Sequence, residues 1–212
     1  MDTLAPPDRF AGSPPRRQPP ASAQPACRPT PAPDYQTLLA AARDPEDDLT
    51  LAFAGVLGRA LDAGQQPLIR GLPETGFRQI LDTFFPGTVL SNGDQATDGA
   101  ALDELVDLLE LLLESRREPS EPLTWLSHAI ASAAMRDNHL WQDMGLPNRA
   151  LLSRLMADNF PALAARNVGD MKWKKFFYRQ LCERAEVPIC KSPNCADCVD
   201  YSICFGHTPT EV

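Results

Sequence analysis

The chain has 212 residues, of which 43% are hydrophobic and 23% are charged, as is usual for a globular protein of one or two domains. Its formal net charge of -8, from 28 acidic and 20 basic residues, argues against general binding to nucleic acids or anionic membranes, which a negative surface repels. No apolar stretch approaches the roughly 20 residues of a membrane span, and the first 30 residues lack a signal-peptide core, so a cytoplasmic protein is expected.

The first 33 residues are rich in proline and hold 10 of the 21 prolines in the chain. Because proline fixes φ and removes a backbone donor, neither a helix nor a sheet can propagate through this stretch. We therefore predict a disordered tail at 1–33, which includes Cys27.

From Asp34 onward, hydrophobic residues recur with helical spacing. Asp34 and the pair Asp44-Pro45 are start signals, and Gly64 and Pro86-Gly87 are stop signals. Helices are expected at residues 34–42, 45–63, 75–84, 101–115, 122–136, 148–158 and 170–184, with a loop at 89–99 and short turns at 139–145 and 161–166. No segment alternates as a strand does, so we expect an all-α fold, a helical bundle at 34–186 followed by a Cys-rich loop and C-terminus at 187–212.

Charge is distributed unevenly along the chain. Residues 44–121 contain 16 acidic and 5 basic residues, a net charge of -11, which is most simply a solvated surface. Residues 172–191 contain six basic and two acidic residues and include all four lysines of the chain. The basic stretch is the more informative of the two because of the cysteines that follow it.

Four cysteines, Cys190, Cys195, Cys198 and Cys204, form a C-x4-C-x2-C-x5-C array near the C-terminus. Four thiolates within 15 residues can fold around one centre, and thiolates favour iron–sulfur clusters, zinc and copper(I). A structural zinc site usually joins two C-x2-C pairs, whereas this array has a single pair flanked by lone cysteines. The spacing favours an iron–sulfur cluster over zinc, and it leaves open a centre that only stabilises the C-terminus.

The helix expected before the array has one basic and one apolar face. Lys172, Lys175 and Arg179 follow each other at helical spacing and would attract an oxyanion. The apolar positions, expected in the core, are Trp173, Phe176, Phe177 and Leu181. Cys182, on the same helix, is expected to be a buried, inert thiol, although a fifth thiol ligand is the alternative.

The three histidines are further candidates for binding a metal or an oxyanion. His128 and His139 are 11 residues apart and would share a face if one helix ran through both, although satisfied or exposed imidazoles are the simpler interpretation. His207, three residues after the last cysteine, is a candidate extra ligand. Catalytic residues are not predicted, because the chain has no catalytic triad order, phosphate-binding glycine loop or HExxH motif.

Two sequence blocks, together with the cysteine array, resemble those of the NifQ family. One runs from Asp137 to Leu146 (DNHLWQDMGL), and the other from Met171 to Glu183 (MKWKKFFYRQLCE). The resemblance covers roughly residues 35–207, and the Pro-rich tail is not part of it.

The resemblance implies a carrier that holds a molybdenum–iron–sulfur cluster, processes molybdate and donates molybdenum for assembly of the iron–molybdenum cofactor of nitrogenase. Its implied partners are the nitrogenase iron protein and the NifEN cofactor scaffold. The implied cluster ligands are Cys190, Cys195, Cys198 and Cys204, and a carrier is expected rather than an enzyme that turns over.

Two alternatives come from other classes of protein. A zinc-stabilised helical adaptor without chemistry would contain zinc and no sulfide. A helix-hairpin-helix DNA glycosylase can end in a four-cysteine iron–sulfur loop, but the net charge of -8 and the lack of a Gly-containing hairpin motif argue against it.

Overall fold

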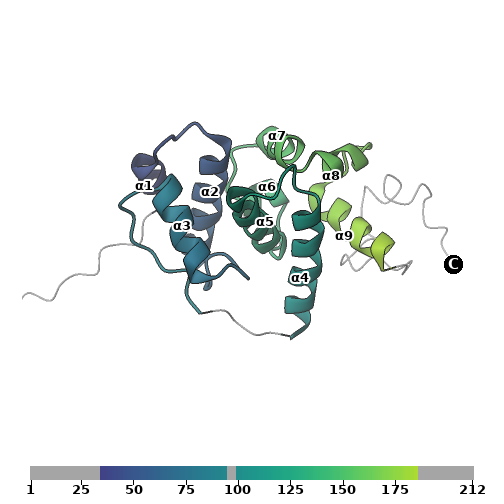
Figure 1. Ribbon diagram of the computed structural model, residues 1–212, viewed down its shortest axis with the longest axis horizontal. Coiled ribbons are helices and arrows are strands. Elements are labelled where there is room, and N and C mark those ends of the chain that lie inside the picture. The colour runs from purple at the N-terminus through teal and green to yellow at the C-terminus, as the bar shows by residue number, and fades with distance from the viewer. Residues whose placement is uncertain (1–33, 95–98, 186–212) are drawn as a thin grey trace, which may run out of the picture. The chain divides into compact units, whose positions relative to one another are not determined.

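The computed structural model describes residues 34–94 and 99–185, and within these ranges the chain forms nine α-helices and no β-strand (Figure 1). The all-α prediction is therefore confirmed for this part of the chain. The Pro-rich tail and the Cys-rich segment lie outside the described residues. The helices are α1 (Tyr35–Ala41), α2 (Asp48–Asp62), α3 (Glu74–Phe84), α4 (Gly99–Glu114), α5 (Glu121–Ala134), α6 (Leu140–Asp143), α7 (Arg149–Asn159), α8 (Pro161–Arg166) and α9 (Trp173–Arg184).

Side-chain caps fix the first two helix starts. The Asp34 carboxylate accepts a hydrogen bond from the backbone N–H of Thr37 at 2.8 Å, as expected for an N-cap. The expected start of α2 at Pro45 is wrong by three residues. Asp47 is the N-cap instead, because its carboxylate accepts hydrogen bonds from both the N–H and the hydroxyl of Thr50.

Two helix boundaries in the C-terminal half of the chain also differ from the prediction. The expected turn at 139–145 contains the one-turn helix α6, and the last helix begins at Trp173 rather than at Asp170. Asp170 cannot start a helix because its φ is +47°, in the left-handed region. The side chain of Asn167 stabilises this turn by exchanging two hydrogen bonds with the backbone of Met171.

The hydrophobic core is built around α5, which packs against α2 and α4 (Figure 1). Eleven of the 14 residues of α5 are buried, many of them alanine, so neighbouring helices can approach closely. Gly55 of α2 adds a further close contact, with the backbone at Met144 and Gly145, just after α6. This contact ties the end of α6 to the core. In the part of the chain that the structure describes, no helix is long and apolar enough to cross a membrane.

Helix α9 is anchored by aromatic side chains. Trp173, Phe176 and Phe177 are each no more than 6% exposed, which confirms their predicted place in the core. The Trp173 ring contacts both phenylalanine rings, with centroids 5.7 and 5.9 Å apart. Leu181 is partly buried against the same cluster. The apolar face of α9 thus fixes where its basic face points.

Candidate functional site

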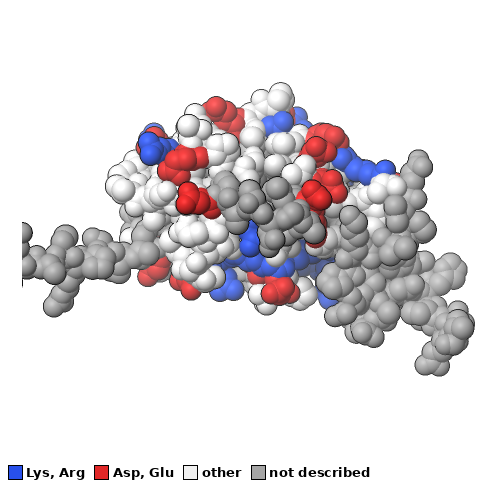
Figure 2. Space-filling view, turned by 90° about the horizontal axis from the view of Figure 1, so that it is seen from below, with Lys and Arg blue, Asp and Glu red and all other residues white. Residues whose placement is uncertain are grey.

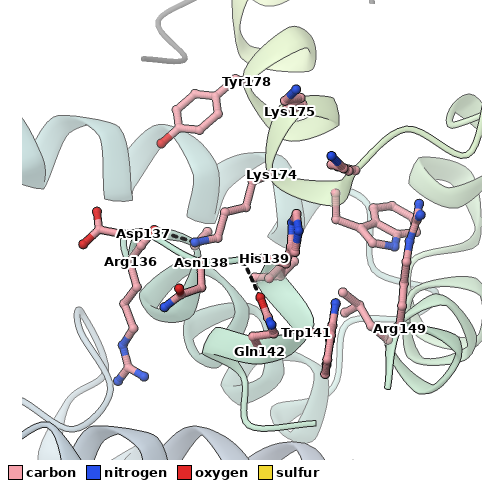
Figure 3. A pocket seen from close by; sticks show the side chains of 15 residues that line it. Arg136, Asp137, Asn138, His139, Trp141, Gln142, Arg149, Lys174, Lys175 and Tyr178 are labelled. Carbon is pink, nitrogen blue, oxygen red and sulfur yellow. Dashed lines mark hydrogen bonds between the residues drawn. The ribbon is translucent and has the colours of Figure 1, made fainter. Parts of the chain in front are cut away.

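A cavity of about 580 Å³ opens between the α5–α6 connection and the first half of α9 (Figure 3). Its walls come from the segments Ala134–Gln142 and Lys172–Lys175, completed by side chains of α7 and by Tyr178. The lining residues are Ala134, Arg136, Asp137, Asn138, His139, Leu140, Trp141, Gln142, Arg149, Leu152, Lys172, Trp173, Lys174, Lys175 and Tyr178. The two sequence blocks singled out at 137–146 and 171–183 therefore face each other across one cavity.

The polar lining of the cavity is predominantly basic. Five arginine and lysine side chains line it, and the single acidic residue in the lining is Asp137. In Figure 3 the carboxylate of Asp137 lies at one end, well apart from His139 and Arg149. Figure 2 shows a band of basic side chains near the middle of one face, while other basic side chains lie among acidic ones elsewhere on that face.

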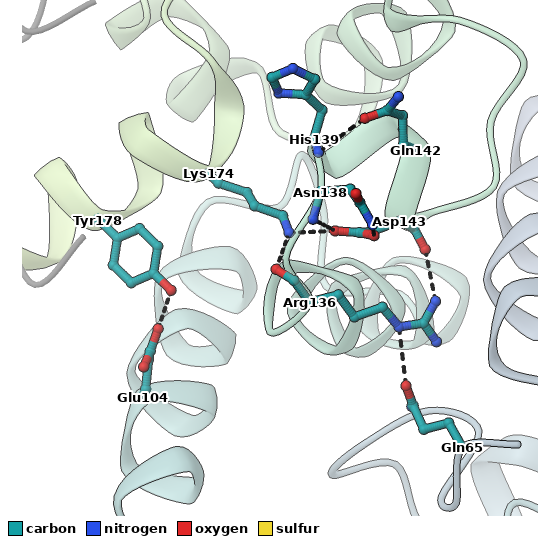
Figure 4. A network of polar contacts seen from close by, with 9 residues as sticks. All are labelled: Gln65, Glu104, Arg136, Asn138, His139, Gln142, Asp143, Lys174 and Tyr178. Atoms are coloured by element: carbon teal, nitrogen blue, oxygen red, sulfur yellow. Dashed lines mark hydrogen bonds and ion pairs between the residues drawn. The ribbon is translucent and has the colours of Figure 1, made fainter. Parts of the chain in front are cut away.

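A buried ion pair joins the two walls. The Lys174 ammonium contacts the Asp143 carboxylate at 2.5 Å and also donates to the backbone carbonyl of Arg136 (Figure 4). Asp143 is only 1% exposed, and it accepts two further hydrogen bonds from Asn138, one from the backbone N–H and one from the side chain. A charge at this depth requires such partners, so the network fixes α9 against the α5–α6 connection.

Arg136 lines the cavity, but its guanidinium points into the body of the protein. Its guanidinium donates to the Gln65 side chain at 3.0 Å and to the Asp143 carbonyl at 3.1 Å (Figure 4). Burial lowers the pKa of Arg136, although the nearby Asp143 carboxylate opposes that shift. Its Nη2 atom is buried and has no hydrogen-bond partner within the described part of the chain. Arg136 therefore acts as a structural support behind the cavity.

Arg149 shapes the turn that leads into α9. Its guanidinium donates to the backbone carbonyl of Asp170 at 2.7 Å and to the Asp170 carboxylate at 2.8 Å. Because Asp170 has a left-handed backbone conformation, these bonds stabilise the turn where the chain reverses into Lys172. Arg149 thus positions the start of α9 while its side chain also lines the cavity.

The two candidate histidines do not lie on one helix. Helix α5 ends at Ala134, and His139 is the N-cap of α6, so the two imidazoles do not share a helical face. His139 is exposed, and its imidazole extends from the start of α6 toward α9 (Figure 3).

His128 belongs to the core rather than to the cavity. It is 9% exposed, its Nδ1 has no hydrogen-bond partner among the described residues, and burial lowers its pKa. It faces the backbone at Gly71, where an added Cβ would lie 3.4 Å from Nδ1.

The predicted basic face of α9 is only partly gathered at the cavity. Lys172 and Lys175 line it, whereas Arg179 lies outside the lining and forms an exposed ion pair with Glu183 at 2.8 Å. Cys182 is half-buried on the same helix, so the prediction of a buried thiol is wrong. The basic side chains that matter for this cavity are therefore those of the first turn of α9.

Sequence reasoning missed Arg136, Asp143 and Arg149. Each makes its contacts with residues distant in the sequence, and no local spacing reveals such pairs. The one available signal was the position of Asp143 within the 137–146 block. As a buried acid it required a cationic partner, and the lysine-rich stretch at 172–175 supplied one.

The predicted cluster ligands Cys190, Cys195, Cys198 and Cys204 lie outside the described residues, as does His207. Within residues 34–94 and 99–185, no group of three or more His, Cys, Asp or Glu side chains is arranged to hold a metal ion. The cavity is thus the candidate site that the structure describes, and the cysteine array stays a prediction.

Comparison with known proteins gives one consistent family. The NifQ family model matches residues 52–206. Protein NifQ of Azotobacter vinelandii is 38% identical over 155 residues, covering 66% of this chain and 78% of that protein. Protein NifQ of Rhodobacter capsulatus is 39% identical over 151 residues, covering 70% and 83%, and the NifQ homolog of Sinorhizobium fredii is 38% identical over 161 residues, covering 73% and 70%. No solved structure matches the chain significantly.

Proposed function

The chain belongs to the NifQ family, which acts in nitrogen fixation, and on that premise we propose that it carries a molybdenum–iron–sulfur cluster and donates molybdenum for assembly of the iron–molybdenum cofactor. The observation that carries this proposal is the cysteine array at 190–204 in a chain of this family. The cluster is cargo in this scheme, and the chain is a carrier rather than an enzyme that turns over.

The chemistry of the array supports cluster binding. Cys190, Cys195, Cys198 and Cys204 supply four soft thiolate ligands, and such ligands suit iron–sulfur centres. Their single C-x2-C pair differs from the paired arrangement of a structural zinc site. We also propose His207 as an additional ligand, because it follows the last cysteine by three residues.

The position of the array relative to α9 supports delivery of an anionic cargo. Cys190 follows Arg184, the last residue of α9, by six residues in the sequence. A thiolate-ligated cluster is negatively charged, so basic residues on the helix that precedes it stabilise the loaded state. The proposed recipients are the nitrogenase iron protein and the NifEN scaffold, as the family resemblance implies.

The test is the metal and sulfide content of the full-length chain, purified without oxygen and incubated with iron, sulfide and molybdate. Wild type is expected to hold iron, acid-labile sulfide and molybdenum, and Cys195→Ser to lose most of all three. Cys182→Ser, which removes a thiol on α9 outside the array, is the matched control and is expected to keep them.

Stoichiometric zinc without labile sulfide would contradict the proposal and favour the structural zinc alternative. Donation is tested by mixing the loaded chain with cofactor-deficient NifEN and following molybdenum after the proteins are separated. Retention of all molybdenum on the chain, with the iron protein and reductant present, would count against the donor role.

A further inference from the structure

We propose that Arg59, Arg70 and Arg136 form a docking surface for the acidic face of a partner protein. The three side chains come from the last turn of α2, from the segment that follows it, and from the chain just after α5. This surface goes beyond the proposed function, because none of its residues has a role in holding the cluster.

Hydrogen bonds along one face of α5 bring the three elements together. The backbone N–H of Arg70 donates to the Ser132 hydroxyl at 3.1 Å. One helical turn further along, the Arg136 guanidinium donates to the Gln65 side chain at 3.0 Å (Figure 4). Gln65 also lies against the last turn of α2, because its backbone N–H donates to a carbonyl of that turn at 2.8 Å. The same turn carries Arg59, so the three arginines belong to one region of the fold.

The positive charges of this region are not paired with carboxylates in the described part of the chain. No ion pair or side-chain hydrogen bond joins Arg59 or Arg70 to another described residue. The carboxylate that acts on Arg136 is that of Asp143, which already holds the Lys174 ammonium at 2.5 Å. A group of like charges without counter-charges destabilises a fold by self-repulsion, and this cost favours a role in binding.

The pKa of Arg136 supports the proximity of the three charges. Burial is the main cause of its lowered pKa, and the Asp143 carboxylate opposes that shift. The charges of Arg59 and Arg70 lower the pKa further, as charges of the same sign do at short range.

The three arginines contribute to the surface in different ways. Arg59 is exposed and Arg70 is half-exposed, so both are accessible to a partner. Arg136 is half-buried and its Nη2 atom is buried, so it adds positive charge from behind rather than a direct contact. A cation at the C-terminus of α2 would be explained by the helix dipole alone. That explanation does not extend to Arg70 and Arg136, which lie outside this helix.

An acidic protein surface fits this group of arginines better than a nucleic acid does. A guanidinium and a carboxylate form two parallel hydrogen bonds, which favours arginine where carboxylates are recognised. The chain has a net charge of -8, and residues 44–121, which include Arg59 and Arg70, have a net charge of -11. These surroundings repel an extended phosphate backbone, whereas a folded partner can place its carboxylates on the arginines alone. The same repulsion would orient an acidic partner toward this surface.

The test is the binding of a fluorescently labelled decaglutamate peptide to the full-length chain, followed by fluorescence anisotropy at low ionic strength. We expect the double variant Arg59→Met/Arg70→Met to raise Kd about tenfold or more, because two charge-assisted contacts are lost. Methionine keeps an unbranched apolar stem at each position, and circular dichroism checks that the helices are intact. Arg136→Gln is expected to weaken binding by a smaller factor, because its charge acts without direct contact.

The matched control is Arg78→Met/Arg166→Met, which removes two positive charges from exposed positions on α3 and α8. It is expected to change Kd by less than about threefold, since exposed charges away from the bound peptide are screened. If Arg59→Met/Arg70→Met binds the peptide as wild type does, the docking surface is overturned. An equal loss in the control pair would also overturn it, because the overall charge of the chain would then explain the binding.

Competing probes distinguish the class of partner. Tighter binding of an oligothymidylate than of decaglutamate, with the same dependence on Arg59 and Arg70, would assign the surface to nucleic acid and overturn the proposal. Displacement of the peptide by inorganic phosphate, where chloride at equal ionic strength has no effect, would indicate a small-anion site instead and would also overturn it.

The iron and sulfide content of the same variants separates this inference from the proposed function. If Arg59→Met/Arg70→Met holds a normal cluster and loses peptide binding, both ideas are supported. If wild type holds no cluster yet binds the peptide through the arginines, the proposed function fails and the docking surface stands. If the double variant loses the cluster together with peptide binding, the arginines are required for the loaded fold, and a separate docking role is contradicted.

Discussion

Helices α5 and α9 are of similar length, 14 and 12 residues, yet their buried polar side chains have different kinds of partner. On α5 the partners are local or backbone groups. The Ser127 hydroxyl donates to the Leu123 carbonyl at 2.8 Å, and the Ser132 hydroxyl accepts from the Arg70 backbone N–H at 3.1 Å. On α9 the partner of Lys174 is a carboxylate 31 residues away in the sequence.

The difference separates the helix that forms the centre of the core from the helix that forms a charged wall of the cavity. Because these hydrogen bonds satisfy the polar side chains of α5, the helix presents a mostly apolar surface. The neighbouring helices pack tightly against that surface. The Lys174–Asp143 ion pair instead joins α9 to the α5–α6 connection, next to the cavity. Substitutions at the two regions are therefore expected to fail in different ways.

The largest expected loss of stability comes from Gly55, where α2 meets the backbone after α6. A Cβ at this position would lie 2.2 Å from the Met144 carbonyl oxygen and 3.0 Å from the Gly145 carbonyl carbon, and neither can move without shifting the backbone. Alanine would by itself favour a helix over glycine by about 1 kcal/mol. We nevertheless expect Gly55→Ala to lower the free energy of unfolding by about 3 kcal/mol, measured by urea denaturation.

The control for Gly55 is Gly64→Ala, where an added Cβ meets no atom within 4 Å. That substitution bears only the strain of its left-handed φ of +60°, about 1 kcal/mol. Equal losses in the two variants would mean that the contact between α2 and the turn after α6 is looser than described.

The second largest loss of stability is expected from breaking the buried ion pair between Lys174 and Asp143. In Asp143→Asn the Lys174 ammonium, only 15% exposed, loses its charged partner, and we expect a loss of about 3 kcal/mol or slightly less. Arg154→Met breaks a pair between an exposed guanidinium and Asp48, and it is expected to change the stability much less than Asp143→Asn does, because solvent screens the exposed charge. Thermal unfolding of both variants at pH 7 measures the difference.

A double variant sharpens the same comparison. Asp143→Leu/Lys174→Met removes both charges, so it should recover much of the stability lost in Asp143→Asn. If the double variant is as unstable as the single one, the pair is not the main contact between α9 and the α5–α6 connection.

The sequence predicted the helices and the apolar face of α9 because both depend on local periodicity. Trp173, Phe176 and Phe177 are spaced so that any helix through them buries one side, and the structure confirms this. The family was also identified correctly from short blocks of sequence. The cysteine array lies outside the described residues and stays a prediction.

The geometry of the cavity could not be predicted in the same way. The contacts Lys174–Asp143 and Arg149–Asp170 join residues 31 and 21 positions apart, and nothing local to either residue specifies its partner. The interruption between α5 and α6 involves a shorter-range contact, in which the Asp143 carboxylate accepts two hydrogen bonds from Asn138, five positions earlier. The sequence placed His128 and His139 on one face only if a single helix ran through both, whereas the fold places one in the core and the other at the cavity.

The smallest expected effect on stability comes from the two histidines, of which His128 lies in the core and His139 at the cavity. Burial lowers the pKa of His128 below its ordinary value of 6.5, while a backbone contact with Arg70 opposes the shift. Well above pH 6.5 the imidazole is neutral in both the folded and the unfolded chain, so it adds no pH dependence there. Below pH 6.5 the unfolded chain takes up a proton that folded His128 resists, and the free energy of unfolding therefore falls.

Replacing His128 by phenylalanine, which keeps an aromatic ring in the core, removes this acid-dependent loss. Urea unfolding at several pH values between 7.5 and 5 should therefore show a shallower decline for His128→Phe than for wild type. His139→Asn is the matched control, and it should retain the wild-type decline because His128 is still present. If His128→Phe and wild type lose stability in parallel as the pH falls, His128 is protonated as readily in the folded as in the unfolded chain. Water must then reach the imidazole within the buried part of α5.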